Sequence, residues 1–259
     1  MAQPGAQQEV DLCVLYAYHR LCPTTRHHYD LLRWFNPEVA VVPLIAEPLQ
    51  DDGTPLPGTV DVSQFTNHWH VHDIWFSTDT FIYRWFLNRT VTARRYAFLE
   101  WDVLCLGSLL DFYAPVASAD AAATIVLLWP DKLTDSTDWM WFGQRDRLPP
   151  DCRDLATGLV PMAGTIFSHD TLADMCQRAQ EPCWHDVFSE LRLGTLARLS
   201  GATIATHTAA QASISWTEAF RRLELDRPGV YHPVKRVLAP LGWRRTPAGV
   251  DHWPPLNGD

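Results

Sequence analysis

The feature that most limits the possible folds is an apolar run, a helical segment and a second apolar run near the start of the chain. Residues 12–18 and 39–45 are apolar without helical period, as expected of strands buried on both faces. The segment 24–35 has an apolar stripe and a threonine that can cap a helix, and Asn36-Pro37 ends it. Such a unit forms two parallel strands with a right-handed crossover, so we expect an α/β fold with a mostly parallel sheet.

The rest of the chain continues this alternation. Segments expected to be helical are 74–88, about 170–180 and about 184–199, and strand-like runs occupy 97–105, 124–129, 159–167 and 202–206. A connection rich in Trp, Asp and Pro, 130–155, separates two of the strands, and connections of this length are more often functional than idle. We expect a disordered leader at 1–8, one domain at 9–240 and a C-terminal tail at 241–259.

Charge and cysteine usage exclude several classes of protein. The net charge of −9 argues against a nucleic-acid-binding surface, although a bound metal ion can still supply positive charge for a phosphorylated small molecule. The six cysteines lack C-x-x-C spacing, which favours a reduced, cytoplasmic protein. The polar N-terminus does not resemble a signal peptide, and no apolar run reaches membrane-spanning length, so we expect no transmembrane segment.

The strand-like run at 97–105 contains two carboxylates, Glu100 and Asp102. On an extended strand, residues two apart point the same way, with Cα atoms about 6.5–7 Å apart. Two carboxylates on a rigid support can share a hard divalent cation, directly or through water. Alternatively, both carboxylates are solvated side chains at the end of a strand and bind no metal.

A second candidate is the late segment Tyr231-His232-Pro233-Val234-Lys235. A neutral imidazole, here His232, can complete a mixed oxygen and nitrogen coordination shell. Lys235 can offset the charge of a phosphate group. The alternative is a histidine in a loop before proline, with no ligand role.

The third candidate is the acidic pair Asp186 and Glu190. If 184–199 is one helix, the two carboxylates are four residues apart and share a face. A carboxylate that faces a pocket can act as a general base. The pair can equally be a solvent-facing acidic stripe.

Three histidines at alternate positions, His68, His70 and His72, form a fourth candidate. On a strand they would share one face, and His-rich tracts can bind zinc. The segment follows a loop, however, and no clear strand continues from it.

Taken in order, these segments resemble the nucleotide-sugar-dependent glycosyltransferases of the GT-A fold, over roughly residues 10–238. The strand that ends in Glu100-Trp101-Asp102 stands in the place of that fold's Asp-x-Asp motif. Residues 158–167 look like the small-residue strand that lines the sugar and acceptor pocket, and the acidic helix and the late histidine follow. The sequence departs from the motif at its first position, which is Glu rather than Asp.

The resemblance implies a GT-A-like, Rossmann-like single domain, in which helices flank a mostly parallel central sheet. It also implies a hexosyltransferase-like enzyme that uses Mn²⁺ or Mg²⁺. Such an enzyme moves a sugar from a nucleoside-diphosphate-sugar, such as a UDP-sugar, to a hydroxyl of a glycan, lipid or small-molecule acceptor. Asp102 would hold the metal directly with His232, whereas Glu100 would reach the metal through water or contact the ribose.

The resemblance also implies roles for other residues. Lys235 would place a positive charge on the diphosphate, and Glu190 or Asp186 would deprotonate the acceptor in an inverting mechanism. Gly164 belongs to the pocket strand, and Trp139-Met140-Trp141-Phe142 forms either an acceptor platform or ordinary core or lid packing. Residues just after the first strand would lie near the nucleobase: Tyr16, Tyr18 and His19.

Two other functions stay open on the sequence. One is a zinc-dependent hydrolase built on His68, His70 and His72. The other is a catalytically silent nucleotide-sugar-binding protein, which the glutamate at position 100 leaves open.

Overall fold

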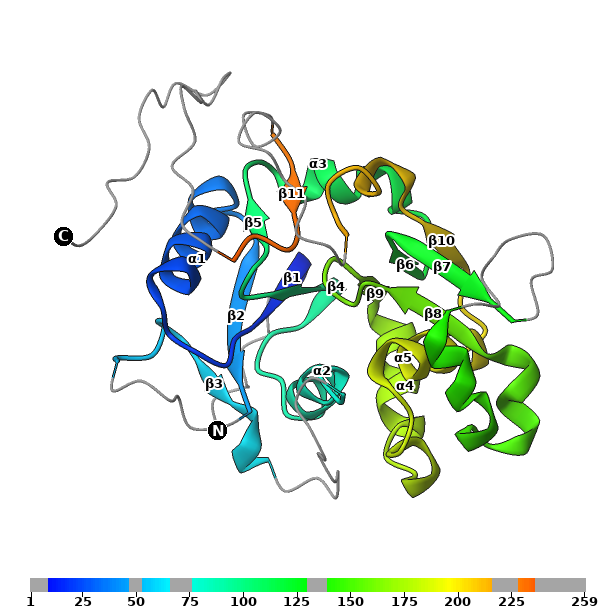
Figure 1. The fold of residues 1–259 in the computed structure, drawn as a ribbon. Helices are drawn as coiled ribbons and strands as arrows, with labels where there is room; N and C mark the ends of the chain where they lie inside the picture. Colours follow the sequence, from blue (N-terminus) through cyan, green and yellow to red (C-terminus); the bar gives the residue numbers. More distant parts are fainter. Residues whose placement is uncertain (1–8, 47–52, 66–75, 130–138, 216–227, 236–259) are drawn as a thin grey trace, which may run out of the picture.

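The computed structural model describes residues 9–46, 53–65, 76–129, 139–215 and 228–235. Its central sheet has seven strands in the order β10-β6-β9-β4-β1-β2-β3 (Figure 1). These are β1 (Val10–Ala17), β2 (Ala40–Ile45), β3 (Val60–Asp61), β4 (Ala93–Glu100), β6 (Ala121–Ala123), β9 (Ile166–Ser168) and β10 (Ile204–Thr206). Every pairing is parallel except those of β9, which runs antiparallel to β4 and β6. The expected α/β fold with a mostly parallel sheet is confirmed.

Two small sheets lie beside the central one. The strand β5 (Leu104–Cys105) pairs antiparallel with β11 (Val230–Tyr231), and β7 (Ile125–Leu128) pairs antiparallel with β8 (Thr157–Val160). The β5–β11 pair joins two segments that are far apart in the sequence. It therefore brings the late segment around residue 232 to the end of β4.

Helices cover both faces of the central sheet. They are α1 (Pro23–Phe35), α2 (Asp79–Leu87), α3 (Leu109–Tyr113), α4 (His169–Arg178) and α5 (Ser189–Leu199). Alternate residues of β1 enter opposite cores: Leu15 packs in the cluster with α2, α4 and α5, whereas Tyr16 packs in the cluster with α1 and α3. Figure 1 shows these two groups of helices on opposite sides of the sheet. This period-two alternation explains why β1 is apolar on both faces from Leu12 onward.

Several expected element boundaries are wrong. The run 97–105 divides into β4 and β5, because a tight turn at Trp101-Asp102 interrupts it. The run 159–167 divides into β8 and β9, and residues 161–165 between them are not strand. The helix expected from about 184 begins only at Ser189.

The connection 130–155 is not structureless where it is described. It contains two 3-10 helices, Met140–Arg147 and Pro150–Leu155. The proposed leader 1–8 and tail 241–259 lie outside the described residues, so this division of the chain stays a prediction. Within the described part of the chain, no helix has the length and apolar character needed to cross a membrane.

Candidate metal centre

The carboxylates of Glu100 and Asp102 are placed by the turn that ends β4. The Val103 amide donates to the Glu100 carbonyl at 2.9 Å, which closes the turn between β4 and β5. The two residues therefore do not lie on one extended strand, as the sequence spacing suggested. Asp102 is only 5% exposed and Glu100 is half-buried, so the two carboxylates lie at the margin of the core, at the carboxyl end of a central strand.

His232 completes a cluster with these carboxylates. Its Nε2 lies 3.6 Å from Oε2 of Glu100 and 3.5 Å from Oδ1 of Asp102. One ligand atom from each of the three residues lies within 4.8 Å of the others. The Val234 amide donates to the Asp102 carbonyl at 2.8 Å, which fixes the late segment against the turn. The structure thus brings together the three residues expected to bind a metal.

A hydrogen bond on the far side of the imidazole orients His232. Its Nδ1 lies 2.8 Å from the Ser215 carbonyl, which can only accept, so Nδ1 carries the proton. In the neutral ring, Nε2 then carries a lone pair on the side of the carboxylates, where it can bind a cation. Metal-binding histidines commonly have this arrangement. Burial opposes protonation of His232, but its hydrogen bond to Glu100 and the charges of both carboxylates outweigh burial and raise its pKa.

The donor set fits a divalent cation. The Oδ1 atom of Asp102 is buried and accepts no hydrogen bond from the described residues, and such atoms are costly without a partner. Burial raises the pKa of Asp102 to about 6, the His232 charge lowers it, and the Glu100 charge raises it further. A bound cation would give Oδ1 of Asp102 a partner and would offset the repulsion between Asp102 and Glu100. Two carboxylates are ligands that suit Mn²⁺ or Mg²⁺, and the imidazole can complete a mixed shell with a nitrogen ligand.

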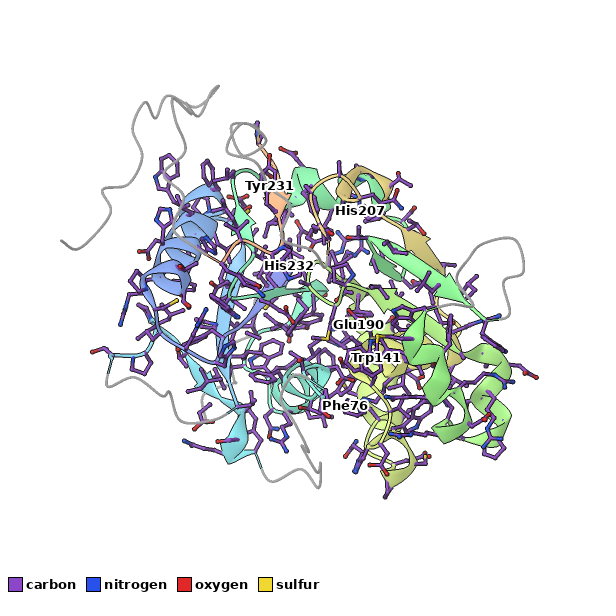
Figure 2. All side chains as sticks on the ribbon, in the orientation of Figure 1. Phe76, Trp141, Glu190, His207, Tyr231 and His232 are labelled. Atoms are coloured by element: carbon purple, nitrogen blue, oxygen red, sulfur yellow. The ribbon has the colours of Figure 1, made fainter. Side chains whose placement is uncertain are left out.

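Glu190 lies in the first turn of α5 and is electrostatically linked to this cluster. One of its oxygens, Oε1, accepts a hydrogen bond from the Met162 amide at 3.0 Å. Burial raises its pKa to about 8, the Met162 hydrogen bond opposes this, and the Glu100 charge adds to it. The His232 charge also acts on Glu190, and Figure 2 labels both residues. A carboxyl group with a raised pKa beside a candidate metal centre is a candidate proton acceptor.

Asp186 does not share a helix face with Glu190, so that expectation is wrong. Asp186 lies in the turn before α5 and is exposed. Its carbonyl accepts from Arg147 at 3.2 Å, and it lines a surface hollow with Arg147 and Arg153. Of the two acidic residues, only Glu190 is placed with the cluster.

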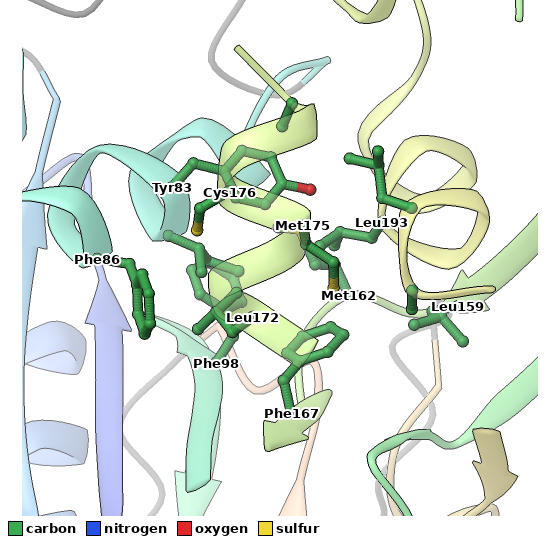
Figure 3. Packing of buried hydrophobic residues seen from close by; sticks show 14 of the residues in the cluster. Tyr83, Phe86, Phe98, Leu159, Met162, Phe167, Leu172, Met175, Cys176 and Leu193 are labelled. Atoms are coloured by element: carbon green, nitrogen blue, oxygen red, sulfur yellow. The ribbon is translucent and has the colours of Figure 1, made fainter. Parts of the chain in front are cut away.

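A buried ion pair holds the start of α5 in place. Arg192 donates through Nε to Oδ2 of Asp79 in α2 at 2.6 Å and through Nη2 to Oδ1 of the same residue. Its Nη1 also donates to the Trp184 carbonyl at 2.8 Å. Leu193 packs in the buried cluster that includes Met162 (Figure 3). The sequence interpretation missed this pair, although an arginine between two leucines in a helix was a usable signal.

The residues expected near a nucleobase differ in exposure. Tyr16 and Tyr18 are buried, and their hydroxyls bond inside the protein, to the Trp101 carbonyl at 3.1 Å and to Thr59 Oγ1 at 2.7 Å. His19 is exposed and makes an edge contact with Trp101, with ring centroids 5.5 Å apart. Of the three, only His19 offers an exposed side chain for contact with a ligand.

Lys235 and Gly164, the other two residues with an expected binding role, differ in their surroundings. Lys235 is exposed, and its charge lowers the pKa of Asp102, against the larger effect of burial. Gly164 has φ +88°, and a Cβ there would lie 2.7 Å from Cδ1 of Ile214. Glycine is therefore required at this position by the backbone and by packing, whatever its part in a pocket.

The tryptophan-rich segment is at least partly core. Trp139 lies so close to Gly158 that a Cβ there would meet the indole at 2.7 Å, and Phe142 is buried. Trp141 stacks on Phe188, just before α5, with ring centroids 3.9 Å apart. The histidines of the fourth candidate, His68, His70 and His72, lie outside the described residues. Within the described residues, the cluster of acidic and histidine side chains that could hold a metal is Glu100, Asp102 and His232.

Comparison with known proteins gives distant structural matches. No family model matches the chain, and no curated protein does. Among solved structures, galactosyltransferase LgtC in complex with donor and acceptor sugar analogues matches with a TM-score of 0.44 and 12% identity, over 75% of this chain and 72% of that one. An active-site mutant of LgtC has a TM-score of 0.43 and 14% identity, over 80% of both chains.

The apo structure of WbbM, a bifunctional glycosyltransferase, also matches. Its TM-score is 0.38 and its identity 12%, over 76% of this chain and 38% of that one. These matches are glycosyltransferases, the class that the sequence resembles. At this level of similarity, they do not assign an activity to this chain.

Proposed function

We propose that this chain is a glycosyltransferase that moves a sugar from a nucleoside-diphosphate-sugar to an acceptor hydroxyl with the help of Mn²⁺ or Mg²⁺. The observation that carries the proposal is the cluster of Glu100, Asp102 and His232, with the half-buried Glu190 within range of its charges. The cluster lies at the carboxyl end of β4, in the middle of the sheet. Ligands of open α/β sheets bind at that edge.

Departure of a nucleoside diphosphate leaves extra negative charge on its phosphate oxygens. A bound divalent cation supplies positive charge to those oxygens. Asp102 and His232 are the residues that would hold it directly, because their ligand atoms are buried and already oriented. Half-buried Glu100 either joins them, acts through water or contacts the ribose. Lys235 adds a second positive charge at the same place.

Glu190 is the residue that we assign as base. The Met162 amide fixes one of its oxygens, which leaves the other to receive the proton of the acceptor hydroxyl. As the acceptor oxygen bonds to the anomeric carbon, the bond to the diphosphate breaks and the proton passes to Glu190. A pKa of about 8 suits a base that works near neutral pH. Exposed Asp186 is the weaker candidate for this role.

A thermal-shift screen of nucleotide-sugars, with and without Mn²⁺, tests the proposal. We expect a UDP- or GDP-sugar to raise the melting temperature only when Mn²⁺ is present, and Asp102→Ala to abolish the shift. Asp186→Ala is the matched control, because it removes an exposed carboxylate away from the cluster. Stabilisation that survives both a chelator and Asp102→Ala would show that the metal assignment is wrong.

No observation on the described residues favours a zinc hydrolase. Metal analysis of the purified protein tests it directly: one tightly held zinc that is lost in His70→Ala would support it against our proposal. Release of free sugar from the bound nucleotide-sugar excludes a catalytically silent binding protein.

A further inference from the structure

The turn that carries the two carboxylates is held by three consecutive backbone carbonyls. The Glu100 carbonyl accepts from the Val103 amide, and the Asp102 carbonyl accepts from the Val234 amide. The carbonyl between them, at Trp101, accepts from two side chains instead. These are the Tyr16 hydroxyl at 3.1 Å and Nδ1 of His28 at 3.2 Å.

These two donors are themselves rigidly placed. Tyr16 is fully buried near the end of β1, and its ring packs against Tyr29 of α1 with centroids 5.7 Å apart. His28 is fully buried on α1, and burial lowers its pKa to about 3, so the ring is neutral. A carbonyl only accepts, so the Nδ1 atom that faces Trp101 carries the proton. The Tyr16 hydroxyl has one proton and two carbonyls within reach. The Trp101 carbonyl, at 3.1 Å, is nearer than the Thr25 carbonyl, at 3.3 Å.

The Trp101 carbonyl belongs to the peptide unit that joins Trp101 to Asp102. Fixing this peptide unit and the next one sets the backbone on both sides of the Asp102 Cα, and with it the direction of the side chain. Of the three carbonyls, only this one is held by side chains, so only here can substitution loosen the turn without changing the backbone. Residues that orient metal ligands from behind typically change metal affinity by about 10–100-fold when they are lost.

We infer that Tyr16 and His28 are positioning residues for the metal centre, which act by holding the Trp101 carbonyl and thereby aiming Asp102. The inference rests on the proposed metal site. It also gives Tyr16 a role other than contact with a nucleobase. Both residues would act through the Trp101 carbonyl, and neither belongs to the cluster of candidate ligands.

Titration with Mn²⁺ alone, followed by the electron paramagnetic resonance signal of the free ion, tests the inference without an activity assay. We expect Tyr16→Phe and His28→Leu to weaken Mn²⁺ binding by about 10-fold or more. His28→Asn keeps an N–H donor near the position of Nδ1 and should bind within about 3-fold of wild type. His28→Leu and His28→Asn also give an answer if Tyr16→Phe fails to fold.

Tyr18→Phe is the matched control. It removes a hydroxyl from a tyrosine that is equally buried two residues along, but that bonds to Thr59 and the Leu56 amide rather than to Trp101. A purely structural role predicts that Tyr16→Phe and Tyr18→Phe lower the melting temperature alike and leave Mn²⁺ affinity unchanged. That result, or equal weakening by both, overturns the inference. Absence of Mn²⁺ binding by the wild-type protein overturns the proposed metal site as well.

Discussion

Glu190 illustrates, at the scale of a single residue, how a candidate catalytic group can reduce stability. Its pKa is about 8 in the folded protein against an ordinary value of 4.5, because burial disfavours the charged form. Between these values, the folded state holds a proton that the unfolded state has released, so stability falls as pH rises from 4.5 to 8. Above pH 8, the full cost of the buried charge is present.

Glu190→Gln should therefore stabilise the protein and inactivate it. Glutamine keeps an oxygen for the Met162 amide but cannot ionise. We expect the variant to melt about 3 °C or more above wild type at pH 8 and close to it at pH 4.5. Turnover should fall by about 10²–10⁴-fold, with Mn²⁺ affinity unchanged. Melting curves at both pH values, in the presence of a chelator, measure the first effect.

The control is Glu181→Gln, the same substitution at an exposed position. It should leave both the pH dependence of melting and turnover unchanged. If Glu190→Gln follows the wild-type pH dependence, the carboxyl group is not buried as a costly charge. If the variant keeps full turnover, Glu190 is not the base.

Residue type explains which parts of the site the sequence could predict. Glu100, Asp102 and His232 were identifiable as candidate ligands because carboxylate and imidazole groups are the ligands that divalent metals use. The backbone carbonyls that support the cluster were not identifiable. They are those of Trp101, which accepts from Tyr16 and His28, and Ser215, which accepts from His232. Every residue carries a carbonyl, so no residue type marks the ones that matter, and only the folded backbone brings their partners to them.

At the scale of elements, long strands and helices were predictable and their interruptions were not. Continuous apolar runs predicted β1 and β2, and an apolar stripe predicted α1, each nearly to its observed ends. Of the residues that usually mark a turn, the turn at Trp101-Asp102 has only Asp102 and neither glycine nor proline, and apolar runs lie at 97–99 and 103–106, so the whole run was interpreted as one strand. A hydrogen bond between Glu100 and Val103 stabilises the turn in their place.

The contact between α5 and β8 depends on a glycine in the middle of the helix. A Cβ at Gly194 would lie 2.2 Å from the Thr157 carbonyl oxygen, which is backbone and cannot move aside cheaply. The Thr157 amide donates to Oγ1 of Thr195 at 3.2 Å, so the two elements are locked at this point. This close approach explains why a glycine stands at position 194, although glycine destabilises a helix by about 1 kcal/mol relative to alanine.

Gly194→Ala should therefore destabilise the protein despite its better helix propensity. We expect a loss of about 1–3 kcal/mol in the free energy of unfolding, measured by urea titration. Turnover should fall as well, because α5 carries Glu190. Gly143→Ala is the control: nothing lies within 4 Å of its added Cβ, and the change should stay within about 0.5 kcal/mol. An unchanged or higher stability of Gly194→Ala would contradict the close contact.

At the scale of the whole molecule, the site is a product of topology. Its residues come from the end of β4, the start of α5 and the segment after β11. The central position of β4 and the antiparallel pairing of β5 with β11 bring these distant parts of the chain together. The order of segments in the sequence predicted the candidate residues and an α/β sheet. It did not predict the pairing of strands as short as β5 and β11, because that pairing depends on contacts between distant parts of the chain.

A cation held between Asp102 and His232 should join the turn after β4 to the late segment and slow its opening. The Val234 amide donates to the Asp102 carbonyl and the Ser215 amide to the His232 carbonyl, so both amides exchange only when this junction opens. Mn²⁺ at about 100 times its dissociation constant adds about 2.7 kcal/mol to the free energy of any opening that releases it.

Exchange at the Val234 and Ser215 amides should then slow by up to about 100-fold, measured by hydrogen–deuterium exchange. The Gly201 amide bonds to the Arg198 carbonyl at the end of α5 and exchanges by local fraying that leaves the cation bound, so it serves as the internal reference and should not change. In His232→Ala, the Mn²⁺ effect should disappear. Equal slowing of all amides in the wild-type protein, or no slowing of the two junction amides, would contradict a cation at this place.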